Sequence, residues 1–214
     1  MKSLLAFGIL FFALSFCGIT DKIKEQVSET SNNPATKENT DTAEKNSDGD
    51  DIVEKPELTD EQQKILDNGK EIKWDDQGIN FTVPDGWNKM SVQKQMLNYG
   101  SPKTGFLISS VSIMQDDFPV ETSLKATHTQ ALQQLKNGRY ENVRWLELGG
   151  IKGVEWVEAP SENKGNPRRH QWIGFRNYQG QNQQLNIILS TKSGEFDDKK
   201  DTFAAILYSM KTDN

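Results

Sequence analysis

The sequence predicts an α+β domain, an α/β/α sandwich in which helices cover both faces of a mainly antiparallel sheet. The first observation is that candidate strands such as Phe106–Met114 and Leu185–Leu189 carry apolar residues in both phases, which is typical of strands buried on both faces. The second is that two other segments repeat apolar residues at helical spacing, so helices are available as covers. We place this domain at residues 58–214.

The predicted domain opens with a short helix and a hairpin. Thr59-Asp60-Glu61-Gln62 has the form of a capping box, in which the Thr and Gln side chains accept hydrogen bonds from backbone amides at the start of a helix. Residues 71–74 and 79–83 then alternate polar and apolar side chains on either side of Asp75–Gly78, which predicts a β-hairpin. Pro84–Trp87 marks the next turn, because proline fixes its own φ and glycine allows a positive φ.

The remaining elements follow from the same two periodicities. Strands are expected at 143–148 and 153–159, and a hairpin is expected from 171–178 and 183–192 with its turn at Gln179–Gly180. Two apolar stripes predict longer helices, the first made of Leu124, His128, Ala131, Leu132 and Leu135, and the second of Phe203, Ile206, Leu207 and Met210.

Residues 1–16 have the character of a secretory signal peptide. Lys2 and the amino terminus supply positive charge, and the run from Leu4 to Phe16 is uncharged throughout. Such a run has the length of a signal-peptide core, roughly 7–15 residues, and is shorter than the ~20 residues that span a bilayer. We therefore expect an exported protein and no permanent membrane helix in this segment.

The only cysteine of the chain, Cys17, follows this run directly. Leu14-Ser15-Phe16-Cys17 resembles the lipobox of bacterial lipoproteins, in which the thiol receives a diacylglycerol and a dedicated peptidase cleaves before the cysteine. Phe16 departs from the small residue that is usual before the cysteine. We expect Cys17 to carry palmitate-type acyl chains that anchor the protein to a membrane. The alternative is cleavage after Ser15 by ordinary signal peptidase, which would release a soluble secreted or periplasmic protein.

The segment from Cys17 to residue 57 is predicted to be a disordered acidic tether. It is rich in Ser, Thr, Asn and charged residues and contains no aromatic residue, so it cannot bury enough apolar surface to fold. Its acidic residues outnumber its basic residues by as much as the net charge of the whole chain, −6. Glu44–Gly49 imitates the start of a calcium loop, but Lys55 occupies the closing position, so no metal is expected.

Gly18 bears on the choice of membrane. In the enterobacterial sorting rule, an Asp directly after the acylated cysteine retains a lipoprotein at the inner membrane, and Gly18 lacks that signal. We therefore expect the cell envelope, and the outer membrane before the inner one.

Five short segments of the predicted domain resemble the PsbP-like superfamily. They are Gly78–Trp87, Ser101-Pro102, the helix start at Ser123-Leu124, Leu148–Gly153 and Phe203–Lys211. This superfamily includes the extrinsic protein of the photosynthetic oxygen-evolving complex, a nuclear import factor that binds Ran, and many bacterial lipoproteins. The resemblance implies an α/β/α sandwich without catalytic machinery that works by binding other proteins.

Residue types suited to catalysis are sparse. His128 and His170 are the only histidines, and the chain has neither a G-x-S-x-G motif nor a metal-ligand spacing. We therefore expect a noncatalytic protein-interaction module without cofactor, metal or nucleic acid. An uncharacterised hydrolase is the distant alternative, and it would require Glu155, Glu158 and Glu162 to gather around one pocket.

One short region is a candidate contact site. Arg168, Arg169 and His170 are expected to form a small cationic loop for an anionic group or an acidic partner, with an ordinary solvated loop as the alternative. Trp172 lies beside it and is the candidate for stacking on a sugar, which makes a glycan-binding or small-ligand-binding lipoprotein the second interpretation. The other four tryptophans are assigned to the core: Trp74, Trp87, Trp145 and Trp156.

Overall fold

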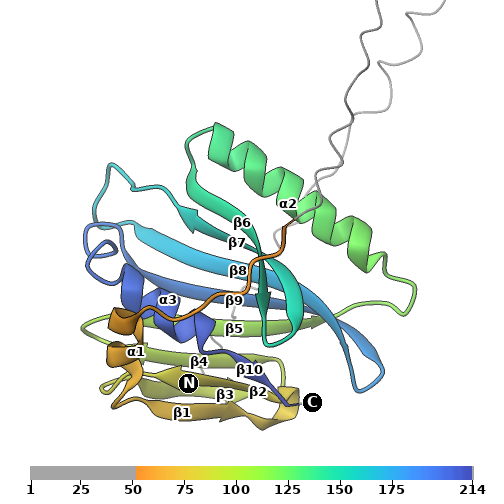
Figure 1. Ribbon diagram of the computed structural model, residues 1–214, viewed down its shortest axis with the longest axis horizontal. Helices are drawn as coiled ribbons and strands as arrows, with labels where there is room; N and C mark the ends of the chain where they lie inside the picture. Colours follow the sequence, from red (N-terminus) through yellow and green to blue (C-terminus); the bar gives the residue numbers. More distant parts are fainter. Residues whose placement is uncertain (1–51, 214) are drawn as a thin grey trace, which may run out of the picture. The chain divides into compact units, whose positions relative to one another are not determined.

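The computed structural model describes residues 52–213, which form an α+β domain with two antiparallel sheets and three α-helices (Figure 1). The signal peptide, Cys17 and the tether up to residue 51 lie outside the described residues. The helices are α1 (Asp60–Leu66), α2 (Val120–Lys136) and α3 (Lys200–Tyr208), and one 3-10 turn, η1, spans Asp75–Gln77.

The larger sheet has seven strands in the spatial order β3-β4-β5-β9-β8-β7-β6. All of its neighbouring strands are antiparallel. In chain order the strands are β3 (Asn88–Gln93), β4 (Met96–Ser101), β5 (Gly105–Ile113), β6 (Tyr140–Leu148), β7 (Ile151–Glu158), β8 (Pro167–Tyr178) and β9 (Gln181–Lys192).

The smaller sheet has the order β1-β2-β10, from β1 (Lys70–Trp74), β2 (Ile79–Val83) and β10 (Lys211–Thr212). Its hairpin turns through η1 as the sequence predicts, and Gly78 adopts a φ of 54° at the end of that turn. The expectation of one continuous sheet is wrong, because β2 pairs with β10 from the end of the chain and forms a sheet separate from the large one.

The two faces of the large sheet carry two separate hydrophobic cores. On one face, α3 and the smaller sheet enclose a core that includes Leu146, Trp172 and Ile187. On the other face, α2 packs on β6, β7 and β8 and encloses a core that includes Trp145 and Trp156. Trp145 and Leu146 are consecutive residues of β6 and enter different cores, because successive side chains of a strand point to opposite faces.

Helix α2 covers only part of its face of the large sheet. It packs on β6, β7 and β8, while β9, β5, β4 and β3 extend beyond it (Figure 1). The expectation that Phe106–Met114 is buried on both faces is therefore wrong for the side chains that point to the α2 side of the sheet. Leu107 is fully buried, whereas Phe106 and Ile108 remain 46% and 37% exposed.

Several local predictions are confirmed. Thr59 caps α1 through a hydrogen bond from the Gln62 amide, and the Gln62 side chain accepts one from the Thr59 amide, each at 3.2 Å. The β8–β9 hairpin turns at Gln179–Gly180, with Tyr178 paired with Gln181. The four tryptophans assigned to the core are all buried.

Strand β3 has no counterpart among the sequence-based expectations. Its alternation is interrupted by a register shift between Lys89 and Ser91, where it pairs with β4. A bulge of this kind breaks the two-residue period by which strands are recognised in a sequence.

The packed domain begins before the expected boundary at residue 58. Val53 packs into the core under α2, and the backbone of Glu54 forms a parallel bridge with β6 at Leu146. Lys55 pairs with Glu147 at 2.9 Å. Residues 53–55 therefore pack with the domain.

Candidate functional site

The expected cationic loop at Arg168–His170 is wrong, because these residues lie inside strand β8, which begins at Pro167. Alternation along the strand turns Arg168, His170 and Trp172 toward the α3 face, where they are 1%, 4% and 0% exposed. Arg169 points to the other face and keeps 42% of its side chain exposed, paired with Glu158 at 2.7 Å. These four residues therefore form no common contact surface.

Arg168 is held by partners on several sides. Its guanidinium contacts Glu141 at 2.5 Å and Asp197 at 2.7 Å, and its Nε donates to the Glu158 carbonyl at 2.7 Å. The Phe196 ring centroid lies 4.3 Å from the guanidinium carbon. A buried arginine with this many partners acts as a structural tie and not as a site for an external anion.

Trp172 is also structural. Its indole Nε1 donates to the Leu146 carbonyl at 3.1 Å, and its ring lies against Gly153 and Gly174. A Cβ at either glycine would overlap the ring. Trp172 therefore has no free face on which a sugar could stack.

His170 belongs to a buried charge cluster, which we call the Glu155 cluster and define as Glu155, His170, Arg144 and Tyr208. Glu155 is fully buried, and one of its oxygens lies 2.6 Å from His170 Nε2 and accepts a hydrogen bond from Tyr208 Oη at 2.8 Å. Its other oxygen accepts from Arg144 Nε at 2.5 Å. Arg144 also reaches Glu54, so the cluster ties the start of the domain to β6, β7, β8 and α3.

The cluster keeps Glu155 ionised. Burial by itself would raise the pKa of Glu155, but the contacts with His170 and Arg144 outweigh burial and lower the pKa to about 2. Burial and the nearby Glu155 carboxylate raise the pKa of Tyr208. The buried negative charge of Glu155 is thus stabilised by its contacts with Arg144 and His170.

The geometry does not support the carboxylate-based hydrolase. Glu155 points to the α3 face, whereas Glu158 pairs with Arg169 on the α2 face of the same strand. An acid and a base for glycoside hydrolysis must face one cleft. Glu155 and Glu158 are therefore not gathered with Glu162 around one pocket.

The part of the large sheet that α2 leaves uncovered is the candidate interaction surface. We call it the open face and define it by Met90, Met96, Phe106 and Ile108. These side chains are 61%, 40%, 46% and 37% exposed. Met90 and Phe106 approach each other over Gly100, where a Cβ would lie 2.9 Å from the Met90 sulfur and 3.0 Å from Phe106 Cδ1.

The positions of β4, β5 and β9 on this face are uncharged over most of their length. The pairing register places the following residues of β4, β5 and β9 on the same face: Met96, Asn98, Gly100, Phe106, Ile108, Ser110, Ser112, Gln184, Asn186, Ile188 and Ser190. Charged side chains lie at the edge of this group. They are Lys192 at the end of β9 and the Arg169–Glu158 pair on the neighbouring strands β8 and β7. Exposed apolar side chains grouped on a face with an uncharged centre are typical of a surface that binds another protein.

A cavity of about 880 Å³ lies on the same side of the sheet, between α2, β7, β8 and the loop 159–166. Its lining includes Trp156 and three glutamines. Among residues 52–213, no group of three or more His, Cys, Asp or Glu side chains is placed to hold a metal ion. Within the same residues, no helix has the length and apolar character needed to cross a membrane.

No protein-family model matches the sequence. No curated protein matches it either.

The chain is similar to several solved structures at low sequence identity. LpqN of Mycobacterium tuberculosis, described as involved in cell envelope biogenesis, is 18% identical, with 70% of this chain and 95% of that chain covered at a TM-score of 0.48. Cyanobacterial PsbP from Synechocystis is 14% identical, with coverage of 68% and 93% and a TM-score of 0.44. The Ran-binding protein Mog1p of Saccharomyces cerevisiae is 11% identical, with coverage of 68% and 95% and a TM-score of 0.39. The chain spans about half, 49%, of a similar Bacteroides thetaiotaomicron protein.

Proposed function

We propose that this chain is an exported lipoprotein of PsbP-like α/β/α sandwich type, anchored through Cys17, whose domain binds a partner protein through the open face and catalyses no reaction. The observation that supports the binding role is the group of exposed apolar side chains on the half of the sheet that α2 leaves uncovered.

The chemistry of the open face favours a protein partner. Methionine and phenylalanine are enriched in protein interfaces, and charged residues are depleted at interface centres. The open face has both properties, with Met90, Met96 and Phe106 exposed and no charge on the described positions of β4 and β5 around them. A surface with an uncharged centre offers little to attract nucleic acid phosphates.

The anchoring part of the proposal rests on the sequence around Cys17. Two or more acyl chains give stable membrane attachment where one chain is marginal. If the ~35 residues between Cys17 and Val53 form a flexible spacer, its reach would be roughly 32 Å, which would let the domain meet a partner away from the lipid surface. We propose the cell envelope as the location, with the outer membrane favoured over the inner one.

Site-specific photocrosslinking in intact cells tests the binding role. A photoreactive amino acid at position 108 places the probe on the open face, and one at position 125 places it on α2, where Lys125 is 60% exposed. We expect a discrete crosslinked protein from position 108 that is absent from position 125 and is lost in a Phe106→Ser variant. Identical patterns from both positions, crosslinks to lipid alone or crosslinks only to a second copy would contradict the proposal.

Mass spectrometry of the mature amino-terminal peptide tests the anchor separately. We expect a peptide that begins at Cys17 and carries a diacylglycerol. A peptide that begins at Phe16 with an unmodified Cys17 thiol would remove the anchor and leave the binding role intact.

A further inference from the structure

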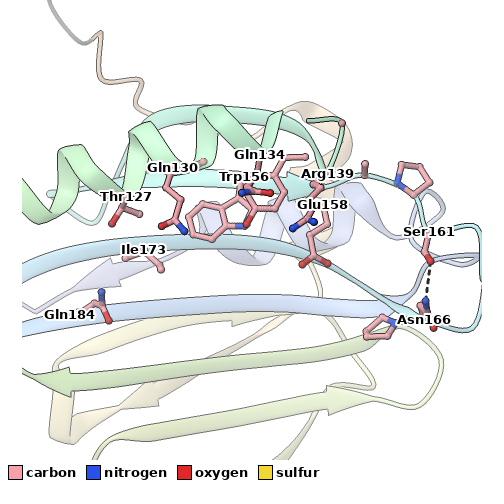
Figure 2. A pocket seen from close by; sticks show the side chains of 16 residues that line it. Thr127, Gln130, Gln134, Arg139, Trp156, Glu158, Ser161, Asn166, Ile173 and Gln184 are labelled. Atoms are coloured by element: carbon pink, nitrogen blue, oxygen red, sulfur yellow. Dashed lines mark hydrogen bonds between the residues drawn. The ribbon is translucent and has the colours of Figure 1, made fainter. Parts of the chain in front are cut away.

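The open face borders helix α2 along one side. The cavity beside α2 marks this border, with Thr127 and Gln130 on the helix side and Gln184 of β9 on the sheet side (Figure 2). Gln184 pairs with Ser112 of β5, so the border continues across the strands into the open face. The flank of α2 and the open face therefore form one surface, in which a helix stands beside an uncovered part of the sheet.

Both edges of the large sheet are partly occupied within the described chain. At the β6 edge, the Glu54 amide donates to the Trp145 carbonyl at 3.2 Å, and the Glu147 amide donates to the Glu54 carbonyl at 2.8 Å. At the other edge, β3 is interrupted by its register shift, and Trp74 Nε1 donates to the Gln93 carbonyl at 2.8 Å. Bulges and covered edges oppose pairing with a strand of another chain. We therefore expect a partner to approach the face of the sheet and not its edges.

The dimensions of the open face fit a single helix. Neighbouring strands lie about 4.8 Å apart, so the four strands from β9 to β3 span roughly 14 Å. An α-helix with its side chains is about 10–12 Å wide. The six-residue strands β3 and β4 are roughly 20 Å long, which gives a face of roughly 300 Å² in outline. A stable interface buries about 800 Å² on each partner, so two open faces alone are too small to hold two copies of this chain together.

The apolar side chains of the open face are spaced as one helix would meet them. Phe106 and Ile108 are two positions apart on β5, and Met96 of β4 lies beside Ser110, a further two positions along. Phe106, Ile108 and Met96 together therefore cover roughly 13 Å along the strands. Apolar residues at positions i, i+4 and i+7 of a helix cover about 10.5 Å, because each residue rises 1.5 Å. A single amphipathic helix can thus contact all three side chains.

Helix α2 shows that this side of the sheet accepts such a helix. It buries Leu124 and Ala131, which are seven positions apart, in the core against β6, β7 and β8. Packed helices lie about 8–10 Å apart, which is close to two strand spacings, so a second helix beside α2 would lie over the strands that α2 leaves uncovered. The flank of α2 toward it carries the uncharged Thr127 and Gln130, and the Gln130 amide can both donate to and accept from polar side chains.

We propose that the open face receives an amphipathic α-helix of the partner protein. The helix lies beside α2, with apolar residues at i, i+4 and i+7 against Phe106, Ile108 and Met96, and with uncharged polar residues toward α2. This inference rests on the proposed function, because it names the element of the partner that the same face binds.

Photocrosslinking in intact cells, followed by mass spectrometry of the labelled partner residues, tests the inference. The photoreactive amino acid is placed at position 96 or 108 on the sheet, or at position 130 on α2. We expect all three positions to label one segment of one partner protein. Positions 96 and 108 should label residues three, four or seven apart, and position 130 should label a neighbouring face of the same helix.

The outcomes separate this inference from the proposed function. Labelled partner residues two apart, as in an extended strand, or labels scattered over several segments would overturn the inference and leave the proposed function intact. Crosslinks only to a second copy, crosslinks only to residues 18–51 of this chain, or the absence of any crosslinked protein would overturn both.

The labelled segment, made as a synthetic peptide, is then bound to the full chain in detergent. Ile108→Asp places a charge at the centre of the open face and should weaken peptide binding about tenfold. Val92→Asp is the matched control, because Val92 is similarly exposed, 39% against 37%, but pairs with the buried Leu97 and lies on the opposite face. The Val92→Asp chain should bind as the natural chain does.

A second variant covers the case in which Ile108→Asp does not fold. Met96→Gln replaces a side chain that is 40% exposed and should weaken peptide binding about threefold. Circular dichroism should show that the peptide gains helix when it binds. Equal weakening by Val92→Asp, or a bound peptide that stays extended, would overturn the inference.

Discussion

The face of the large sheet on which α2 packs has a covered half and an open half, although strands of both halves carry apolar side chains on it. Strands β6, β7 and β8 lie under α2, and their side chains on this face, such as Trp145 and Val154, are buried. Strands β9, β5, β4 and β3 extend beyond this cover in the described chain, and Phe106 and Ile108 remain exposed. An apolar residue in a strand therefore does not by itself show which face is covered.

The strands of the covered half also carry buried charges, but on their opposite face, under α3. Glu155 on β7 and Arg168 on β8 point to the α3 face, where each is enclosed and must find partners inside the protein. On the open half, a polar side chain such as Ser110 is only partly buried and can be hydrated. The energetic demands on the two halves differ accordingly, because a buried polar group without a partner is costly.

The largest expected effect comes from removing a ring in the covered half. Trp145→Ala should lower the free energy of unfolding by about 3–5 kcal/mol, because the side chain is 5% exposed and stacks on His128 at 4.3 Å. Phe106→Ala in the open half should lower it by about 1 kcal/mol or less. Chemical denaturation measures both, and equal losses would show that the halves are not distinct.

The next effect is the pH dependence of the Glu155 cluster. The pKa of Glu155 is lowered from 4.5 to about 2 in the folded protein, so its ionised form stabilises the fold above pH 4.5 and this stabilisation is lost as the pH falls toward 2. The loss should amount to about 3 kcal/mol. Denaturation at several pH values should show a shallower decline for Glu155→Gln, whereas the exposed Glu162→Gln should keep the natural slope.

A smaller effect is expected at the glycines that face Trp172. Gly174→Ala should lower the free energy of unfolding by about 2–3 kcal/mol, because the added Cβ overlaps the buried indole ring. Gly165→Ala is the control, since its nearest contact is the Asn163 side chain at 3.3 Å. Thermal denaturation compares the two, and a neutral Gly174→Ala would mean that the ring can move aside.

The smallest effects are expected when an apolar residue is replaced by threonine, once in the covered half and once in the open half. Val154→Thr places a hydroxyl in the covered half, where the side chain is fully buried, and should destabilise the fold by about 1–2 kcal/mol. Ile108→Thr places it in the open half and should change the free energy of unfolding by about 0.5 kcal/mol or less. Urea denaturation measures both, and a destabilising Ile108→Thr would indicate that the open face is covered in solution.

Much of the local structure could be predicted from short stretches of sequence. The capping box at Thr59, the hairpin through η1 and the β8–β9 turn at Gln179–Gly180 depend on neighbouring residues alone. The candidate sites could not be predicted in this way. The alternation of Phe106 and Ile108 with Leu107 separates the two faces of β5, but it does not say which face a helix will cover.

The sequence by itself determined the positions of most helices and strands, because turn residues, caps and periodicity act over a few residues. Only the tertiary structure decided that Arg168 and His170 are buried, that Trp156 lines a cavity and that Phe106 stays exposed. The physical reason is that burial depends on where α2 and α3 lie on the sheet, and their placement is set by packing between segments far apart in the chain.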